Sequence, residues 1–256
     1  MFNFYSGPRP CRLVSAVAAS TLGSWRRPRH AAQFLKGWLR YPLEYAAGKE
    51  VDETPLAGFG DLFPFSGPVE LSLPGSALAR HAWNVHLDEL LFIGLAVQLT
   101  HARRVFEIGT FDGGTTKHMA ECLGPEGHVF TLDLPPGDFD ASQGPDQFSG
   151  SQVGEKFRGT PAADRITQLL GDSTRFDYSP YEHSMDFVFV DAAHDYEHGL
   201  PDSRSALRLV RPGGVIFWHD FAPYWGGLVH AIREATQGQP LRRLSGTSLA
   251  VLQTRE

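Results

Sequence analysis

The chain has 256 residues, of which 42% are hydrophobic and 20% are charged, and its formal net charge is −6. A chain of this size and apolar content can bury one good core, with a small extension. Because no domain-wide surplus of basic residues exists to neutralise phosphates, we expect no nucleic-acid partner.

Two other features bound the class of protein. No run approaches the roughly 18 apolar residues of a membrane-spanning helix, so we expect no stable membrane insertion. Cys11 and Cys122 lie far apart and have no metal-type spacing. Free thiols of this kind predict a cytoplasmic protein.

Residues 1–80 lack the alternation of strands and helices that follows, and we assign them to a helical and loop extension. Residues 13–23 and 34–45 have apolar residues at helical spacing, which predicts amphipathic helices. The first of these imitates a signal peptide only faintly, since no clear cleavage site follows it. Such helices can pack on their own domain or on a second subunit, so a homo-oligomer through this segment stays open. Residues 54–75 are punctuated by Pro and Gly and predict loops over a core.

Residues 81–256 alternate between strand and helix patterns. The apolar runs that predict strands, buried on both faces as in a parallel sheet, are Val105–Ile108, His128–Leu132, Arg165–Leu170, Asp186–Val190 and Gly214–Trp218. Helices are predicted at Leu87–Thr100, Thr115–Leu123, Gly150–Phe157, Glu197–Val210 and Leu228–Thr236. Two short strands, Leu241–Leu244 and Ser248–Gln253, flank a hairpin-like turn. The fold class is therefore α/β, with a doubly wound, Rossmann-like, mostly parallel sheet of seven strands and a C-terminal antiparallel hairpin.

A glycine-rich turn joins the first long strand to the next helix. Glu107 stands at the end of the strand, and Gly109, Thr110 and Gly113 form the turn. Glycine allows a sharp turn and a close approach of a ligand to the backbone, and a helix N-terminus favours anionic or polar ligand groups. The spacing Gly109-x-x-x-Gly113 differs from the G-x-G-x-x-G of dinucleotide-binding proteins. The turn thus predicts a ligand site of another kind.

Polar residues follow almost every predicted strand. In a doubly wound sheet, ligands bind at the carboxyl ends of the strands. The residues at those ends are Glu107 and Gly109, Asp133, Asp172 with Ser173, Asp191 through His194, and His219 with Asp220. One Asp after a strand is ordinary capping chemistry, but five acidic ends on one edge are hard to explain in that way. This edge therefore predicts a site that binds a nucleoside.

The second half of the chain resembles a known family. Residues 185–197, continuing through Asp202, Arg211-Pro-Gly-Gly214 and residues 217–221, resemble class I S-adenosylmethionine-dependent methyltransferases. The similarity is to the small-molecule O-methyltransferase branch that includes macrocin and cephalosporin-pathway enzymes, with catechol and caffeoyl-CoA O-methyltransferases as more distant relatives. Residues 245–251 are also similar to that branch. The resemblance covers residues 85–253 and implies S-adenosyl-L-methionine as cofactor.

Cofactor contacts are carried over from this resemblance position by position. It implies that Glu107, Gly109, Thr110 and Gly113 lie under the methionine part and that Asp133 accepts both ribose hydroxyls, as one carboxylate can. It implies that Asp172 and Ser173 meet the adenine and that Asp191 lies under the sulfonium. A helix N-cap before Thr174 is the structural alternative for Asp172.

The resemblance also raises the question of a metal. Metal-dependent relatives ligate a divalent cation at the position of Asp191, together with the pair that here is His219-Asp220. Mg²⁺ prefers oxygen ligands, so Asp191 and Asp220 suit it or another divalent cation, whereas a ligand at His219 would favour a softer metal. Metal dependence is left open.

His194 is the first candidate for a general base. It lies three residues after Asp191, where catechol-type relatives carry a catalytic lysine. An imidazole titrates near neutrality and suits removal of a hydroxyl proton, with Asp191 or Asp195 to orient it. His219 is the alternative base, and a hydrogen bond to the following helix is the structural reading of His194.

We therefore expect an S-adenosylmethionine-dependent methyltransferase that acts on a small-molecule or sugar hydroxyl in secondary metabolism. N- or C-methyl transfer, an NAD-type oxidoreductase and a non-catalytic member of the fold are the alternatives. The Gly- and Ser-rich insert Pro135–Pro161 is expected to act as a lid or binding loop, since long loops within compact domains often do.

Overall fold

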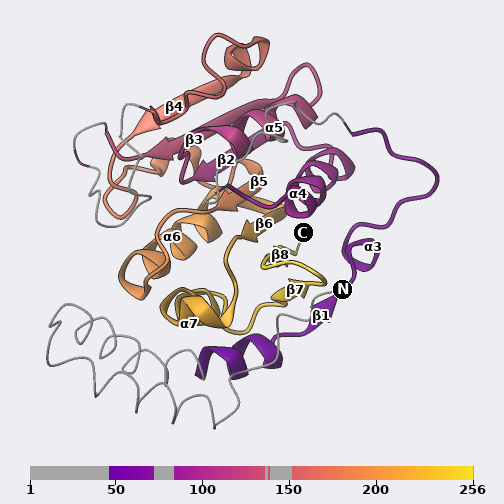
Figure 1. The fold of residues 1–256 in the computed structure, drawn as a ribbon, viewed down its shortest axis with the longest axis vertical. Helices are drawn as coiled ribbons and strands as arrows, with labels where there is room; N and C mark the ends of the chain where they lie inside the picture. The colour runs from indigo at the N-terminus through magenta and orange to yellow at the C-terminus, as the bar shows by residue number, and fades with distance from the viewer. Residues whose placement is uncertain (1–45, 72–83, 136–137, 139–151, 256) are drawn as a thin grey trace, which may run out of the picture. The chain divides into compact units, whose positions relative to one another are not determined.

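The computed structural model describes residues 46–71, 84–135, 138 and 152–255 (Figure 1). The helices predicted at residues 13–23 and 34–45, and most of the insert 135–161, lie outside the described residues. The chain divides into two compact units, Met1–Ala46 and Ala47–Glu256, and the architecture below is that of the second.

The described strands form one sheet in the order β1-β7-β8-β6-β5-β2-β3-β4. Their bounds are β1 Leu56–Ala57, β2 Arg104–Ile108, β3 His128–Asp133, β4 Ile166–Leu170, β5 Met185–Val190, β6 Val210–Trp218, β7 Arg242–Leu244 and β8 Ala250–Gln253. Strands β2 to β6 pair in parallel, while β8 runs antiparallel to both β6 and β7. The predicted fold class is confirmed. The sheet has one strand more than the seven expected, because β1 adds in parallel to β7 at the edge.

Helices cover both faces of this sheet (Figure 1). Their bounds are α3 Phe59–Leu62, α4 Leu87–Leu99, α5 Gly114–Cys122, α6 Tyr196–Leu209 and α7 Gly226–Ala235; residues 46–53 are also helical, and Pro161–Arg165, Ser179–Tyr181 and Pro223–Trp225 form 3₁₀ turns. None of the helices in the described residues is long and apolar enough to cross a membrane.

One predicted helix is replaced by turns. Residues 152–157 do not form the helix expected over Gly150–Phe157. Gly154 has a φ of +71°, a left-handed conformation that interrupts a right-handed helix. Its N–H donates instead to the carbonyl of Phe111, in the glycine-rich turn. This segment thus packs on the turn.

Alternate residues of the central strands face the two helical layers. On β5, Phe187 and Phe189 join the cluster that contains the buried residues of α4 and α5. Val188 and Val190 join the cluster of α6 and α7. Burial on both faces explains why the strand is apolar throughout. The strand ends are therefore where polar side chains can gather.

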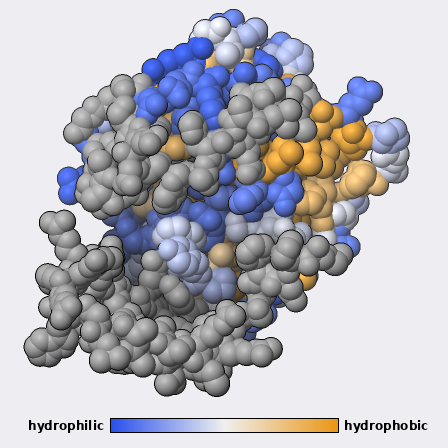
Figure 2. Space-filling view, viewed as in Figure 1, coloured by the Kyte–Doolittle hydropathy of each residue, from blue (hydrophilic) through white to orange (hydrophobic). Residues whose placement is uncertain are grey.

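An aromatic contact attaches the N-terminal segment to α4. The ring of Phe59 lies 5.0 Å from those of both Phe63 and Phe92, measured between centroids. In Figure 2, hydrophobic residues form an orange patch over the region where Figure 1 shows α4. This contact gives α3 its place beside the sheet.

Candidate active site

Both glycines of the turn are required because other parts of the chain approach them too closely for a Cβ. Gly109 has a φ of +100°, and a Cβ there would lie 2.1 Å from the carbonyl oxygen of Asp191. Gly113 has a φ of +81°, and its Cβ would lie 2.6 Å from Cδ1 of Phe157. The ends of β2 and β5 therefore meet closely beneath the turn.

Asp133, at the end of β3, holds this turn in place. Its Oδ2 accepts from the N–H groups of Thr110 at 2.9 Å and Phe111 at 2.7 Å, and its Oδ1 accepts from that of Leu134 at 2.7 Å. Burial raises the pKa of Asp133 against these three hydrogen bonds. Oδ1 keeps acceptor capacity for a further partner, because a carboxylate oxygen has two lone pairs.

Glu107 lies beneath the turn and is fully buried. Its Oε2 accepts from the hydroxyls of Thr116 and of Thr131, the latter at 2.6 Å. Oε1 has no hydrogen-bond partner among the described residues. Burial raises the pKa of Glu107 to about 8. The carboxyl group is thus largely neutral at pH 7, and it supports the turn from below.

A buried ion pair that sequence reasoning missed ties the end of the insert to the turn. Lys156 Nζ lies 2.8 Å from Oδ2 of Asp112, whose side chain is 4% exposed. Asn84 donates to the same oxygen at 2.9 Å, and Asp112 Oδ1 accepts from the N–H of Gly114 at 2.9 Å. No local pattern relates Lys156 to a turn more than forty positions away. Only the tertiary fold reveals the pair.

The two residues predicted for adenine lie after β4. Asp172 accepts from the N–H and hydroxyl of Thr174 at 2.9 and 2.7 Å, but residues 173–175 form a turn, so the helix N-cap considered as its structural alternative is not formed. The Thr174 hydrogen bond lowers the pKa of Asp172. The carbonyl of Ser173 accepts from the Tyr178 hydroxyl at 3.1 Å. The Asp172 side chain is 43% exposed, so it can also meet a ligand.

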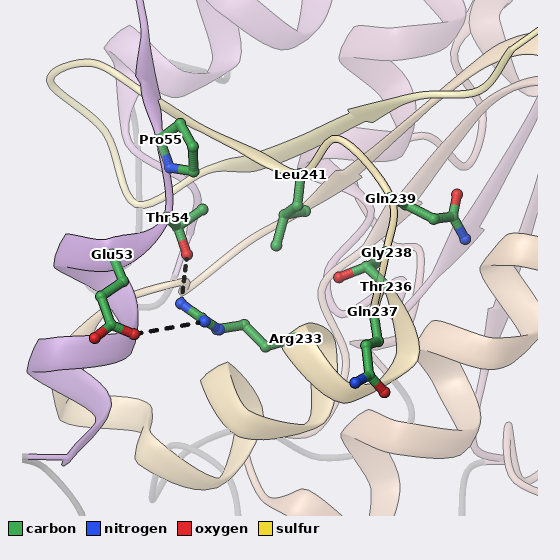
Figure 3. A pocket seen from close by; sticks show the side chains of 9 residues that line it. All are labelled: Glu53, Thr54, Pro55, Arg233, Thr236, Gln237, Gly238, Gln239 and Leu241. Carbon is green, nitrogen blue, oxygen red and sulfur yellow. Dashed lines mark hydrogen bonds and ion pairs between the residues drawn. The ribbon is translucent and has the colours of Figure 1, made fainter.

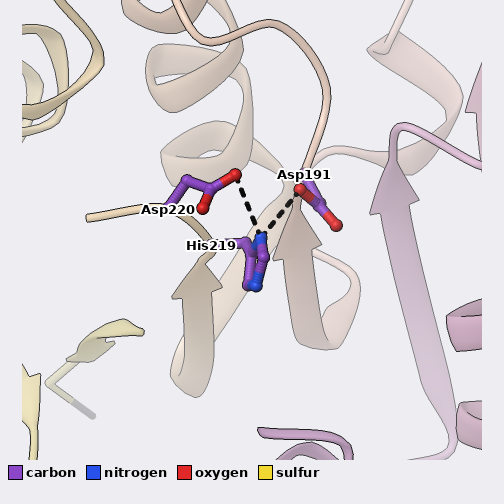
Figure 4. Close-up of side chains that lie close together, drawn as sticks. All are labelled: Asp191, His219 and Asp220. Carbon is purple, nitrogen blue, oxygen red and sulfur yellow. Dashed lines mark hydrogen bonds and ion pairs between the residues drawn. The ribbon is translucent and has the colours of Figure 1, made fainter. Parts of the chain in front are cut away.

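The ends of β5 and β6 bring two carboxylates to one imidazole (Figure 4). His219 Nδ1 lies 3.1 Å from Oδ1 of Asp191 and 3.4 Å from Oδ2 of Asp220. One ligand atom from each of the three residues lies within 4.8 Å of the others. The sequence predicted these residues as neighbours, and the structure brings them together.

Glu89, in the first turn of α4, is the residue here that sequence reasoning missed. Its Oε2 lies 3.0 Å from Nε2 of His219, and its Oε1 accepts from the N–H and hydroxyl of Ser248 at 2.8 Å each. Burial alone would raise the pKa of Glu89, but the hydrogen bond and charge of His219 outweigh it and lower the pKa to about 2. Burial likewise opposes charge on His219, yet its carboxylate partners hold the pKa of the imidazole well above its usual range.

His194 faces the same cluster from the other side. Its Nε2 lies 2.8 Å from Oδ2 of Asp220, and its ring stacks on Trp225 with centroids 4.4 Å apart. Burial lowers the pKa of His194, but the hydrogen bond and charge of Asp220 outweigh it and raise the pKa. Asp195 instead caps α6, where it accepts from the N–H of His198 at 2.8 Å. The carboxylate beside His194 is therefore that of Asp220.

A cavity of about 220 Å³ lies elsewhere, between residues 53–55 and the end of α7 (Figure 3). Within it, Arg233 donates to the hydroxyl of Thr54 at 3.2 Å and pairs with Glu53 at 3.7 Å. None of the predicted site residues lines this cavity. The edge of the sheet is the better candidate for chemistry.

A family model described as a methyltransferase domain matches residues 106–221. The match runs from β2 to the end of β6 and includes the glycine-rich turn, Asp133, Asp191 and the His219-Asp220 pair. This part of the chain is therefore similar to a methyltransferase domain. Glu89 lies outside the matched part of this domain.

Two curated proteins to which the chain is similar are O-methyltransferases. Caffeoyl-CoA O-methyltransferase 2 of Petunia hybrida is 28% identical over 168 residues, which cover 64% of this chain and 64% of that protein. Catechol O-methyltransferase of Mycobacterium tuberculosis is 34% identical over 125 residues, which cover 49% of this chain and 51% of that protein. The matched part thus spans less than two thirds of the length of either relative.

Solved structures share the fold of the domain. An O-methyltransferase from Bacillus cereus in complex with SAH has a TM-score of 0.51 and 22% identity, and the match covers 70% of this chain and 86% of that one. The O-methyltransferase TomG from Streptomyces achromogenes, in complex with SAM, has a TM-score of 0.53 and 18% identity. The match covers 73% of this chain and 92% of TomG. At this identity the similarity establishes the methyltransferase fold.

Proposed function

We propose that the protein is an S-adenosylmethionine-dependent methyltransferase that methylates a hydroxyl group of a small molecule. One observation carries this proposal: the glycine-rich turn lies directly against the Asp191 carbonyl, so a cofactor held at the turn has its reactive end beside the carboxylate–imidazole cluster. The match to a methyltransferase domain and the O-methyltransferase relatives support it.

In this proposal each predicted cofactor residue has a task. Asp133 accepts from a ribose hydroxyl through the remaining lone pair of Oδ1. Asp172 and Ser173 lie at the adenine. The backbone of Gly109, Thr110 and Gly113 faces the methionine part, above the buried carboxyl of Glu107. The carboxylate of Asp191 lies under the sulfonium, whose positive charge it stabilises.

The proposed reaction is an in-line transfer. The acceptor oxygen attacks the methyl carbon, the bond between that carbon and sulfur breaks, and S-adenosylhomocysteine leaves. His194 takes the hydroxyl proton as a general base. Its side chain is 27% exposed and Asp220 holds its Nε2, whereas the His219 side chain is 10% exposed with carboxylates at both ring nitrogens. We therefore assign the base to His194, and to His219 and Asp191 the positioning of the reactants.

A divalent cation fits this cluster. Asp191, His219 and Asp220 offer two carboxylate oxygens and one imidazole nitrogen within 4.8 Å of one another. This mixed donor set suits a transition metal better than Mg²⁺. When bound, such a cation would make the acceptor hydroxyl more acidic.

Binding of S-adenosylhomocysteine tests the proposal. We expect it to raise the unfolding temperature, and NAD to leave that temperature unchanged. Asp133→Asn should weaken S-adenosylhomocysteine binding about 10-fold or more, since a charged hydrogen bond to a ligand contributes about 1.5–3 kcal/mol. Stabilisation by NAD and not by S-adenosylhomocysteine would overturn the proposal in favour of an oxidoreductase.

Transfer itself is tested with caffeic acid, a catechol, as the acceptor probe. His194→Gln should lower kcat by about 100-fold or more while S-adenosylhomocysteine affinity stays within 2-fold, because general-base catalysis contributes about 10²–10⁴-fold. Unchanged kcat in this variant would remove His194 from the mechanism.

A further inference from the structure

We propose that Glu89 is a positioning residue: it holds His219 so that Nδ1 faces Asp191 and Asp220 and completes a mixed nitrogen–oxygen donor set for a divalent transition metal. This inference rests on the proposed function, because it concerns the same cluster. It assigns a role to a residue of α4 that lies outside the matched methyltransferase domain.

Hydrogen bonds fix the orientation of the Glu89 side chain. Its side chain is 4% exposed, and both carboxylate oxygens are engaged. Oε1 accepts twice from Ser248, in the turn between β7 and β8, and Oε2 faces His219 and accepts weakly from the N–H of His86 at 3.3 Å. A carboxylate fixed in this way keeps Oε2 directed at His219.

Glu89 and the two aspartates face opposite nitrogens of the His219 ring. Nε2 lies 3.0 Å from Oε2 of Glu89 and donates its proton to that oxygen. Nδ1 lies 3.1 Å from Oδ1 of Asp191, so in the metal-free protein it carries a proton as well. A cation bound between the two aspartates would take the place of the proton on Nδ1, because a histidine ligand is neutral, and the hydrogen bond to Glu89 would keep the other proton on Nε2.

Metal-ligating histidines usually donate their second ring N–H to a carboxylate, which orients the ring and increases its basicity. Glu89, His219 and the convergent carboxylates reproduce this arrangement. An imidazole nitrogen beside two oxygens favours Mn²⁺ or Co²⁺ over Mg²⁺. Glu89 thus acts on the choice of metal through His219 and touches none of the reacting atoms.

The contact of Glu89 with Ser248 supplies a matched control. A purely structural role would consist in tying α4 to the turn between β7 and β8. Ser248→Ala removes the side-chain half of that tie and leaves the contact between Glu89 and His219. Glu89→Gln keeps the shape of the side chain but leaves one carbonyl oxygen for two N–H donors, those of Ser248 and His219.

Two measurements are made on the metal-free protein. The electron paramagnetic resonance signal of free Mn²⁺ gives the Mn²⁺ affinity, and modulation of the spin echo of bound Mn²⁺ by nitrogen reports whether a nitrogen ligates the ion. S-adenosylhomocysteine affinity is measured separately on the same samples. We expect the wild type to bind Mn²⁺ more than 10-fold tighter than Mg²⁺, with nitrogen modulation. Glu89→Gln and Glu89→Ala should weaken Mn²⁺ binding about 10–100-fold and reduce the modulation, while Ser248→Ala keeps both.

Three results would overturn the inference: no Mn²⁺ binding by the wild type, no nitrogen modulation, or Mn²⁺ affinity and modulation that are unchanged in Glu89→Gln. An equal loss in Ser248→Ala would assign Glu89 to a structural tie instead. Failure of the wild type to bind S-adenosylhomocysteine would refute the proposed function alone, since the Mn²⁺ measurements do not depend on it.

Discussion

Replacement of Gly109 by alanine tests the close approach on which the site is built. The residue has a φ of +100°, and its added Cβ would lie 2.1 Å from the Asp191 oxygen, 2.6 Å from the Asp191 carbonyl carbon and 2.9 Å from Cα of Ala192. All three atoms belong to the backbone, so no flexible side chain can move aside. A left-handed conformation costs an L-residue about 1–2 kcal/mol, and overpacking costs about 1–3 kcal/mol more. We expect Gly109→Ala to lower the free energy of unfolding by about 2–5 kcal/mol.

Gly238→Ala is the matched control for this prediction. Gly238 has a φ of +80°, but nothing lies within 4 Å of the Cβ it would gain. Gly238→Ala should therefore lower the free energy of unfolding only by the cost of the left-handed conformation, about 1–2 kcal/mol. Urea unfolding of both variants, followed by fluorescence, gives the difference, and calorimetry with S-adenosylhomocysteine shows whether the turn still binds. If Gly109→Ala were as stable as Gly238→Ala, the contact between the ends of β2 and β5 would be refuted.

Three further predictions concern single side chains. The pKa of Glu107 is raised from 4.5 to about 8 by burial, so folding takes up a proton and the free energy of unfolding falls as pH rises from 4.5 to 8. Glu107→Gln should abolish this fall, worth up to about 5 kcal/mol, and urea titrations at pH 5, 7 and 9 check it; an unchanged pH slope would contradict the buried state of the carboxyl group. Lys156→Met leaves the charge of Asp112 buried without its cation and should cost about 3 kcal/mol of unfolding free energy, with weaker S-adenosylhomocysteine binding by calorimetry. A variant with wild-type stability and affinity would show that the ion pair has no role. Asp172→Ala should cost about 1 kcal/mol of unfolding free energy, because it removes the hydrogen bonds from the N–H and hydroxyl of Thr174. If Asp172 also meets adenine, S-adenosylhomocysteine affinity falls as well, whereas Thr174→Ala should leave that affinity unchanged.

Much of the fold follows from the sequence because buried parallel strands are apolar throughout. The expected Val105–Ile108 and Asp186–Val190 each differ from the observed strand by one residue, at the N-terminal end. The candidate site follows from the same reasoning. Once the strands are known to be parallel, their carboxyl ends must lie on one edge, and Asp133, Asp191 and His219 must lie there too.

Elements that depend on distant partners could not be predicted in this way. Strand β1 is two residues long, which is too short to show a hydrophobic period in the sequence. It forms because Leu56 and Ala57 pair with β7. The turns at residues 152–157 form because the N–H groups of Gly154 and Lys156 donate to the carbonyls of Phe111 and Asp112. Local propensity does not contain such contacts.

Glu89 shows that residues at the start of a helix, as well as residues at the end of a strand, belong to the candidate site. A helix that precedes a parallel strand through a short connection runs antiparallel to it, so the N-terminus of that helix lies at the carboxyl edge of the sheet. Helix α4 is joined to β2 by residues 100–103, and its first turn therefore reaches the same edge as Asp191 and His219. A carboxylate in the first turn of an otherwise apolar helix is then a candidate for the site, as much as one that follows a strand. The same reasoning applies to Trp225, directly before α7, which stacks on His194. Strand ends and helix starts together, rather than strand ends alone, define the residues from which a site in this fold is built.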